Sequence, residues 1–270
     1  MRENVDIFID TMACCKSNKT LSDAVQQSIS AQKVILENDT VVLDESRLHK
    51  YDKAAEMLVS HKRTFEAAKP YADEDKSVCV LNFANAFNPG GGVVLGDNAQ
   101  EESLCRTSTL YPAISDDKMM TEYYHPHRHN CTPLSNGDII YTPNVKVFKT
   151  DTSMPTILPQ EQWYDVNVIT CAAPDLRSDF ISDQQLEHLH QKRAKRIIET
   201  AISYNNDVLI LGAFGCGAFR NNPKIVSLVY KNVLQNYLNA FDTIEFAIYS
   251  KTDADTNFAA FKSVLNINYN

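Results

Sequence analysis

Apolar residues along the chain follow two patterns that alternate with each other. Continuous short runs, typical of strands buried on both faces of a sheet, occupy 78–83, 166–171, 207–211 and 244–249. Between them, apolar residues recur every three or four positions, the spacing of an amphipathic helix. The helices predicted in this way are 46–69 (ended by Pro70), 99–110, 186–204, a helix that opens at Pro223, and 256–265. This alternation predicts an α/β fold with a mixed, mostly parallel sheet between layers of helices.

The remaining segments complete the expected organisation. A helical pattern predicts an N-terminal extension over 1–35, packed on a single globular domain over 36–270. Residues 41–43 and 138–147 are predicted to be strands, and 123–135, rich in His and Pro, is predicted to be irregular. No stretch rich in Pro, Gly and Ser divides the chain, which favours one domain.

Composition and charge narrow the classes of protein. Of the 270 residues, 44% are hydrophobic and 22% charged, enough to bury a core. No apolar run approaches the ~20 residues that span a bilayer, and the charged first residues do not resemble a signal peptide. Seven cysteines without a Cys-x-x-Cys pair favour free thiols over a disulfide framework. These features predict an intracellular, cytoplasmic protein (nuclear in a eukaryote) with no membrane partner.

The net charge also limits the ligands. At −8 it argues against broad nucleic-acid binding, because such binding needs basic surface to displace counterions from phosphates. An anionic ligand is still compatible with the charge if backbone N–H groups hold it.

Glycine is scarce and is concentrated in two places. Three of the 8 glycines occupy 90–92, directly after the strand over 78–83, and three more lie at 212–217, after the strand over 207–211. Both clusters therefore lie at carboxyl ends of strands, where ligands bind in open α/β sheets. Glycine there allows close approach, and successive N–H groups form a concavity suited to oxyanions.

Amide and carboxyl side chains accompany the first cluster. Asn85 and Asn88 lie where their amides can bond sugar hydroxyls, and Gln100, Glu101 and Glu102 open the next predicted helix. The dipole at a helix start favours carboxylates. Adjacent helical residues point about 100° apart, so the two glutamates are expected to have different roles. The alternative is a tight glycine turn with two glutamates that only decorate a helix start.

The second cluster lies between a strand and a helix that opens at Pro223, which fits a diphosphate-binding loop. It matches neither a Walker A motif nor the G-x-G-x-x-G fingerprint, since Arg220 occupies the third glycine position. Phe214 and Phe219 suggest stacking on a base or packing along a ribose. The alternative is that both phenylalanines belong to the core.

Taken together, the two loops resemble those of the macrodomain superfamily, and within it the microbial-type poly(ADP-ribose) glycohydrolases. That family carries a triple glycine followed by Gln-Glu-Glu, and a second loop of the form Gly-x-aromatic-Gly-Cys-Gly-x-Phe. The resemblance covers roughly residues 40 to 265. The matching residues are Gly90, Gly91, Gly92, Gln100, Glu101 and Glu102 in the first loop, and Gly212, Phe214, Gly215, Cys216, Gly217, Ala218 and Phe219 in the second.

The resemblance implies a macrodomain-like fold and hydrolysis of the ribose–ribose O-glycosidic bonds of poly(ADP-ribose). It implies action from the free end, release of ADP-ribose, and no metal or cofactor. Glu102 would be the general acid/base, with a pKa raised by burial and by its glutamate neighbour, and Glu101 would bind ribose hydroxyls. The expected substrate-binding residues are Asn85, Asn88, Gly90, Gly91, Gly92, Gln100, Phe214, Gly215, Cys216, Gly217, Ala218 and Phe219.

Two other functions are compatible with these loops. One is a mono(ADP-ribosyl) hydrolase that acts on ADP-ribosylated protein, and the other is a binding module for ADP-ribose, against which the paired glutamates count. His125, His127 and His129 alternate as zinc ligands can, but Pro-rich segments collect histidines without metal, so none is expected. Cys171 and Cys216 are predicted to be packing residues rather than nucleophiles.

Overall fold

The computed structural model describes residues 2–265, so residues 1 and 266–270 of the expected domain ranges lie outside the described residues. Within them the chain forms one seven-stranded sheet in the order β1-β4-β5-β3-β6-β7-β2. The strands are β1 Lys33–Ile35, β2 Glu56–Ser60, β3 Val78–Phe83, β4 Ile139–Val147, β5 Tyr164–Cys171, β6 Val208–Leu211 and β7 Thr243–Ala247. Strands β5, β3, β6, β7 and β2 run parallel, while β4 is antiparallel to β5 and β1 to β4.

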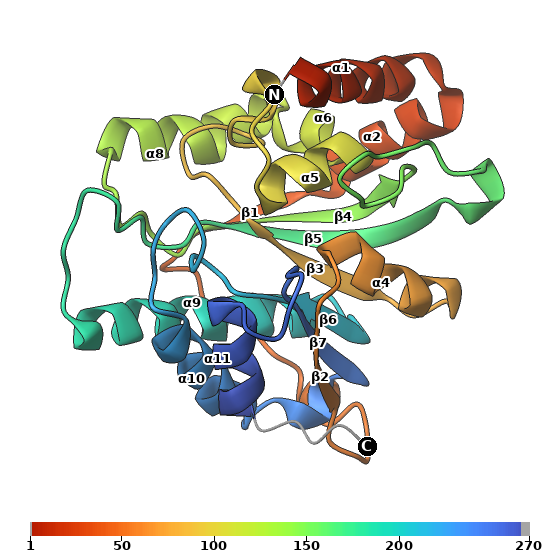
Figure 1. Cartoon of the computed structure of the whole chain (residues 1–270). Helices are drawn as coiled ribbons and strands as arrows, with labels where there is room; N and C mark the ends of the chain where they lie inside the picture. Colours follow the sequence, from red (N-terminus) through yellow and green to blue (C-terminus); the bar gives the residue numbers. More distant parts are fainter. Residues whose placement is uncertain (1, 266–270) are drawn as a thin grey trace.

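Helices cover both faces of the sheet (Figure 1). One layer contains α1 Arg2–Ser17, α2 Lys19–Ala31, α4 Thr64–Asp73, α5 Gln100–Thr107, α6 Leu110–Ile114 and α8 His125–Asn130. The other contains α9 Asp183–Ser203, α10 Pro223–Leu234 and α11 Thr256–Leu265, with α3 Glu45–Leu48 beside α9. The short elements are η1 Val93–Leu95, α7 Asp117–Met119, the π-helix η2 Met120–Tyr124, η3 Gln160–Gln162 and η4 Leu238–Ala240. This architecture confirms the predicted fold class.

The central strand β3 shows why the predicted strands are continuous apolar runs. Val78 and Val80 pack in the core beneath α4 and α5, whereas Cys79 and Leu81 pack in the core beneath α9 and α10. Successive side chains of a strand point to opposite faces, so a strand covered on both sides is apolar on both, as β3 is from Val78 to Leu81. Burial on both faces therefore holds β3 in place, and the chain continues from its carboxyl end into the first glycine cluster.

The N-terminal helices pack on the layer that contains α5. The Thr11 hydroxyl donates to the Arg106 carbonyl over 2.6 Å, and the Asn4 side-chain amide donates to the Gly96 carbonyl over 3.0 Å. The segment then enters the sheet as β1, which pairs with β4. These contacts join the N-terminal segment to α5 and to the chain that follows the first glycine cluster.

The segment between β1 and β3 differs most from the prediction. No strand forms at 41–43, and the helix predicted over 46–69 is instead α3, the edge strand Glu56–Ser60 and the first part of α4. Short apolar runs are compatible with either a helix or a strand, and this one is only partly buried. Pro70 lies inside α4 rather than after it, and the helix continues to Asp73.

The segment predicted to be irregular is helical over 123–130 and irregular over 131–135. It continues the π-helix η2 as α8, and the His127 ring lies between the Tyr123 carbonyl and the Asn136 side chain at 2.7 and 2.8 Å. Alternate residues of a helix point about 200° apart, so the three histidines do not share a face. Across residues 2–265, no group of three His, Cys, Asp or Glu side chains is arranged to hold a metal ion. Nor is any helix in that part of the chain both long and apolar enough to cross a membrane.

Candidate active site

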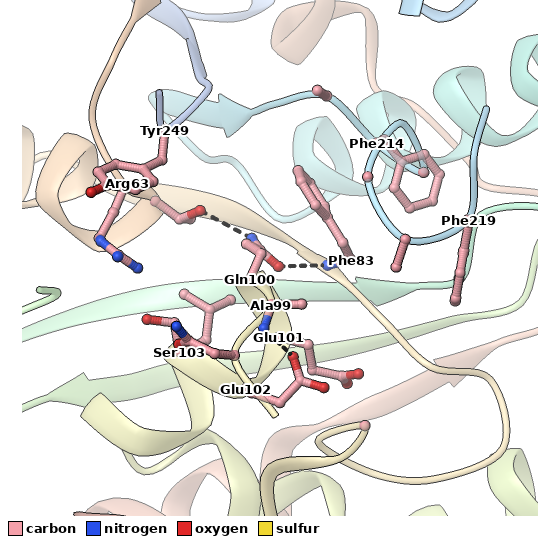
Figure 2. Close-up of a pocket in the computed structure, with 18 of the residues that line it drawn as sticks. Arg63, Phe83, Ala99, Gln100, Glu101, Glu102, Ser103, Phe214, Phe219 and Tyr249 are labelled. Carbon is pink, nitrogen blue, oxygen red and sulfur yellow. Dashed lines mark hydrogen bonds between the residues drawn. The ribbon is translucent and has the colours of Figure 1, made fainter. Parts of the chain in front are cut away.

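A cavity opens beyond the carboxyl ends of β2, β3, β6 and β7, beside the start of α5 (Figure 2). Its volume is about 720 Å³, within the range of about 300–1,000 Å³ that is typical of small-molecule sites. The central strand β3 lies between β5 and β6, so the chain crosses from one side of β3 to the other. Ligands of open α/β sheets bind at such a crossing point.

Glu101 lies in the wall of the cavity with its side chain almost fully buried. Its Oε2 accepts a hydrogen bond from the Asn85 N–H over 2.7 Å, and its Oε1 accepts one from Asn82 Nδ2 over 3.2 Å. Burial raises the pKa of Glu101 to about 8, against the opposing effect of the Asn85 hydrogen bond, and the charge of Glu102 adds to the rise. The raised pKa keeps one proton on this carboxyl at neutral pH.

Glu102 is 7% exposed and binds backbone on two sides. It is the third residue of α5, and its Oε2 accepts from the Ala99 N–H over 3.0 Å, which caps the helix. Its Oε1 accepts from the Gly92 N–H over 2.9 Å. A Cβ at Gly91, whose φ is +58°, would collide with Glu102 Oε1 and lie 3.1 Å from Glu101 Oε2. Both carboxyl groups therefore border one glycine.

The first glycine loop uses its N–H groups internally. The Gly92 N–H donates to the Glu102 carboxyl group, and the Gly91 N–H donates to the Asn88 carbonyl over 3.0 Å. The Gly90 N–H interacts with the Glu101 carboxyl group and lowers its pKa. The sequence suggests an open row of N–H groups here. In the structure their partners are protein acceptors, so this loop orients the two carboxyl groups.

The second glycine loop has the opposite arrangement. Asn221 is buried, and its Nδ2 donates to the carbonyls of Gly215 and Phe219 over 3.0 and 3.1 Å. The backbone N–H groups of Gly217, Ala218 and Phe219 donate to no acceptor among the residues that the structure describes. A run of free N–H groups attracts anions, so this loop can hold a diphosphate.

The two phenylalanines of the second loop differ in exposure. Figure 2 shows both across the cavity from the glutamates. Phe214 is fully buried, with its ring 5.8 Å from that of Phe83, and supports the loop from below. Phe219 is only partly buried, and the Arg177 guanidinium lies 5.3 Å from its ring. Phe219 is therefore the one positioned to pack on a ligand.

Gln100 holds the glutamates against β3. Its Oε1 accepts from the Phe83 N–H over 2.9 Å, and its Nε2 donates to the Leu81 carbonyl over 2.7 Å and to the Thr64 hydroxyl over 3.0 Å. The amide is thus engaged with three protein groups. It fixes the first turn of α5, and with it Glu101 and Glu102.

Eleven of the fourteen expected site residues line the cavity. They are Asn85, Gly91, Gly92, Gln100, Glu101, Glu102, Phe214, Gly215, Gly217, Ala218 and Phe219. The structure places the other three outside the lining. Asn88 is exposed and accepts from Arg128 Nη2 over 3.2 Å, Gly90 is buried, and Cys216 lies behind the loop, where burial raises its pKa to about 12.

Sequence reasoning missed the wall that follows β2 and β7. Arg63 and Tyr249 line the cavity there, with the guanidinium 4.2 Å from the centre of the ring. Arg63 was hidden because β2 was predicted to be part of a helix. Tyr249 carried a usable signal, since it is the last residue of the strand predicted over 244–249 and lies just after β7 in the structure.

The raised pKa of Glu101 predicts a pH dependence of stability. The folded state keeps a proton that the unfolded chain releases, because the pKa is about 8 rather than 4.5. The free energy of unfolding should therefore fall between pH 4.5 and 8, by up to about 1.4 kcal/mol per pH unit. Glu101→Gln abolishes this loss. Thermal melting at several pH values should show the wild type losing stability relative to Glu101→Gln as pH rises.

The matched control for this measurement is Glu161→Gln, which changes an exposed glutamate on η3. Its melting curve should follow that of the wild type at every pH. A constant difference in melting temperature between wild type and Glu101→Gln would contradict the raised pKa.

Comparisons with known proteins place the chain in a family. Residues 3–150 match the family model "Microbial-type PARG, catalytic domain", where PARG denotes poly(ADP-ribose) glycohydrolase. The poly(ADP-ribose) glycohydrolase of Thermomonospora curvata has a similar structure, with a TM-score of 0.85 and 24% identity over 97% of this chain and 99% of that chain. The same enzyme bound to the inhibitor ADP-HPD gives a TM-score of 0.84 and 25% identity, over 97% of this chain and 99% of that chain.

A second solved relative is the poly(ADP-ribose) glycohydrolase of Deinococcus radiodurans in complex with ADP-ribose. It shares 28% identity and a TM-score of 0.76, over 90% of this chain and 96% of that chain. No curated protein sequence matches the chain. The family model covers more than half of the chain and includes both glutamates. The chain therefore belongs to the microbial-type poly(ADP-ribose) glycohydrolase family, which confirms the family, the fold and the enzymatic activity predicted from its sequence.

Proposed function

We propose that this glycohydrolase removes ADP-ribose from the free end of poly(ADP-ribose), with Glu102 as the general acid and base. One observation carries this proposal. A buried carboxyl pair forms one wall of the cavity, and a loop with free backbone N–H groups forms the opposite wall. A volume of about 720 Å³ suits one nucleotide–sugar unit, which favours action at the end of the polymer.

Substrate binding follows from the free groups of the cavity. The diphosphate lies on the N–H groups of Gly217, Ala218 and Phe219, and the Phe219 ring packs along the adjoining ribose. Asn85 uses its Oδ1 to accept from the two N–H groups that follow it in the loop, which leaves its Nδ2 available for a ribose hydroxyl. Glu101 binds the hydroxyls of the terminal ribose, beside the bond that is cut.

The chemical step needs one proton donor that later accepts a proton. Glu102 protonates the leaving ribose oxygen while the bond from the anomeric carbon to that oxygen breaks, and its electron pair leaves with the oxygen. The oxocarbenium-like state that forms is stabilised by the negative charge of the substrate's own diphosphate. Water then adds its hydroxyl to the anomeric carbon and its proton to Glu102. One water is consumed, and the carboxyl group is restored.

Product analysis on labelled polymer tests this function. Release from the free end should give ADP-ribose from the earliest time points, while the polymer shortens gradually. Oligomers that precede ADP-ribose would contradict the exo mode. A second arm offers mono-ADP-ribosylated protein, on which slower release is expected. Faster release there than from polymer would favour the mono(ADP-ribosyl) hydrolase, and Glu102→Gln serves as the blank for contaminating activity.

A further inference from the structure

A fully buried amide lies behind the Glu101 carboxyl, away from the cavity. Asn82 is the second-to-last residue of β3 and does not line the cavity. Its Nδ2 lies 3.2 Å from Glu101 Oε1 and 3.2 Å from the hydroxyl oxygen of Thr170. Its Oδ1 is buried and has no hydrogen-bond partner within residues 2–265. The acceptor half of this amide therefore has no role in the arrangement shown.

Unpartnered buried polar atoms are rare in folded proteins because they cost free energy, and each one calls for an explanation. A second such atom belongs to the same region. The Tyr124 hydroxyl is fully buried without a partner, and Glu101 is the charged group that acts most strongly on its pKa after burial itself. Tyr124 ends the π-helix η2, a type of helix that often occurs at functional sites. Two buried polar atoms without a partner among residues 2–265 thus belong to Asn82, which contacts Glu101, and to Tyr124, on whose pKa Glu101 acts.

An asparagine amide can satisfy a carboxyl group in either of its protonation states. With Nδ2 toward Glu101, as in the structure, it donates to a carboxylate. After a half-turn of the amide, Oδ1 takes that place and accepts from the protonated acid, while the Thr170 hydroxyl can donate to the same Oδ1. The half-turn therefore gives the protonated form of Glu101 an acceptor at Asn82, and it moves Nδ2 to the place that Oδ1 leaves.

We propose that Asn82 is a positioning residue whose amide turns with the protonation of Glu101, so that the proton held by the glutamate pair can move between Glu101 and Glu102. The proposal rests on the proposed role of Glu102. With the proton on Glu101, the Glu102 carboxylate is held by the Gly92 and Ala99 N–H groups. With the proton on Glu102, the Glu101 carboxylate is held by Asn82 and by the Asn85 N–H. The charge of the pair is the same in both states.

The other titratable groups around Glu101 do not take this proton. Burial raises the pKa values of Cys105, Tyr123 and Tyr124 well above their ordinary ranges, so all three stay protonated at neutral pH. Arg106, on the next turn of α5, remains a cation and binds the Asp97 carbonyl over 2.6 Å. The exchange of the proton therefore concerns the two glutamates alone.

Asn82→Leu, which keeps the approximate volume of the side chain, tests the proposal. Without the Asn82 donor the pKa of Glu101 rises, and the proton stays on Glu101 instead of reaching Glu102. We expect kcat to fall at least about tenfold, KM to change little because Asn82 lies outside the cavity lining, and the alkaline limb of the kcat profile to move to higher pH. Unchanged kcat and an unchanged pH profile in a folded Asn82→Leu enzyme would overturn the proposal.

The control is Asn206→Leu, which removes another fully buried asparagine amide, located just before β6 and bonded to the Ala201 carbonyl over 2.8 Å. It should lower stability and leave the pH profile unchanged. If both variants lose activity while keeping the wild-type pH profile, the role of Asn82 is structural and the proposal is wrong.

Side-chain amide NMR of the wild-type enzyme tests the same proposal without relying on a variant that has to fold. The Asn82 ¹⁵N–¹H₂ signals should shift with pH at the midpoint of the alkaline limb, and Glu101→Gln should abolish that shift. Signals that are constant with pH in the wild type would overturn the proposal. Failure of the proposed function looks different, since Glu102→Gln would then be active whatever Asn82 does.

Discussion

Glu102→Gln is expected to lower kcat on poly(ADP-ribose) by about 10²–10⁴-fold, the contribution of a positioned general acid or base. The amide has nearly the shape of the carboxyl group but cannot transfer a proton to the leaving oxygen. Binding of ADP-ribose should persist, because the N–H groups assigned to the diphosphate lie on the opposite loop. Chromatographic measurement of ADP-ribose release at saturating polymer gives the first quantity, and calorimetric titration with ADP-ribose gives the second.

The matched control is Glu66→Gln. Glu66 is the third residue of α4 and accepts from the Arg63 N–H over 3.1 Å, so it caps its helix as Glu102 caps α5. It lies outside the cavity lining. Its replacement should leave turnover close to that of the wild type. If Glu102→Gln turned over polymer as fast as Glu66→Gln, Glu102 would be only a helix cap.

Gly91→Ala is expected to lower kcat/KM by about 10²-fold or more, the effect of displacing a catalytic group by about 1 Å. The new Cβ collides with Glu102 Oε1, so the carboxyl group must leave its place beside the Gly92 N–H. The positive φ of +58° at this position adds strain of about 1–2 kcal/mol for a residue with a side chain. The variant should fold with a somewhat lower melting temperature and lose most of its turnover.

Gly137→Ala is the control for that substitution. Gly137 lies in the loop before β4, outside the cavity lining, and the nearest atom to its new Cβ would be Glu37 Oε1 at 3.4 Å, an ordinary contact. Activity and melting temperature should stay near those of the wild type. A Gly91→Ala enzyme with wild-type kcat/KM would show that the position of the Glu102 carboxyl does not limit the reaction.

The core of the fold could be predicted because its signals are local. Strand β3 is apolar at successive positions since both faces are covered, and the glycines after β3 and β6 mark the two loops of the site. The edge strand β2 could not be recognised, because it is partly exposed and its apolar run is short. Helix α8 was not predicted because its segment is rich in His and Pro, but Pro126 lies in the first turn, where proline is tolerated.

The residues of the candidate site could be predicted from the sequence better than the hydrogen bonds that they make. The sequence places Glu101 and Glu102 behind the first glycine cluster, and the structure brings them together there. Which loop keeps free N–H groups depends on contacts such as Gly92 to Glu102, which form only when α5 packs against the loop. The raised pKa of Glu101 could not be predicted, because it follows from depth of burial, which is visible only in the fold.

A crystal structure of Glu102→Gln with a bound dimer of ADP-ribose would show whether Glu102 reaches the bond that is cut. We expect the side chain at position 102 to lie within hydrogen-bonding reach of the glycosidic oxygen, about 2.6–3.2 Å. We also expect the diphosphate of the terminal unit to lie on the N–H groups of Gly217, Ala218 and Phe219. A glycosidic oxygen far from position 102, with the diphosphate away from that loop, would contradict the proposed mechanism.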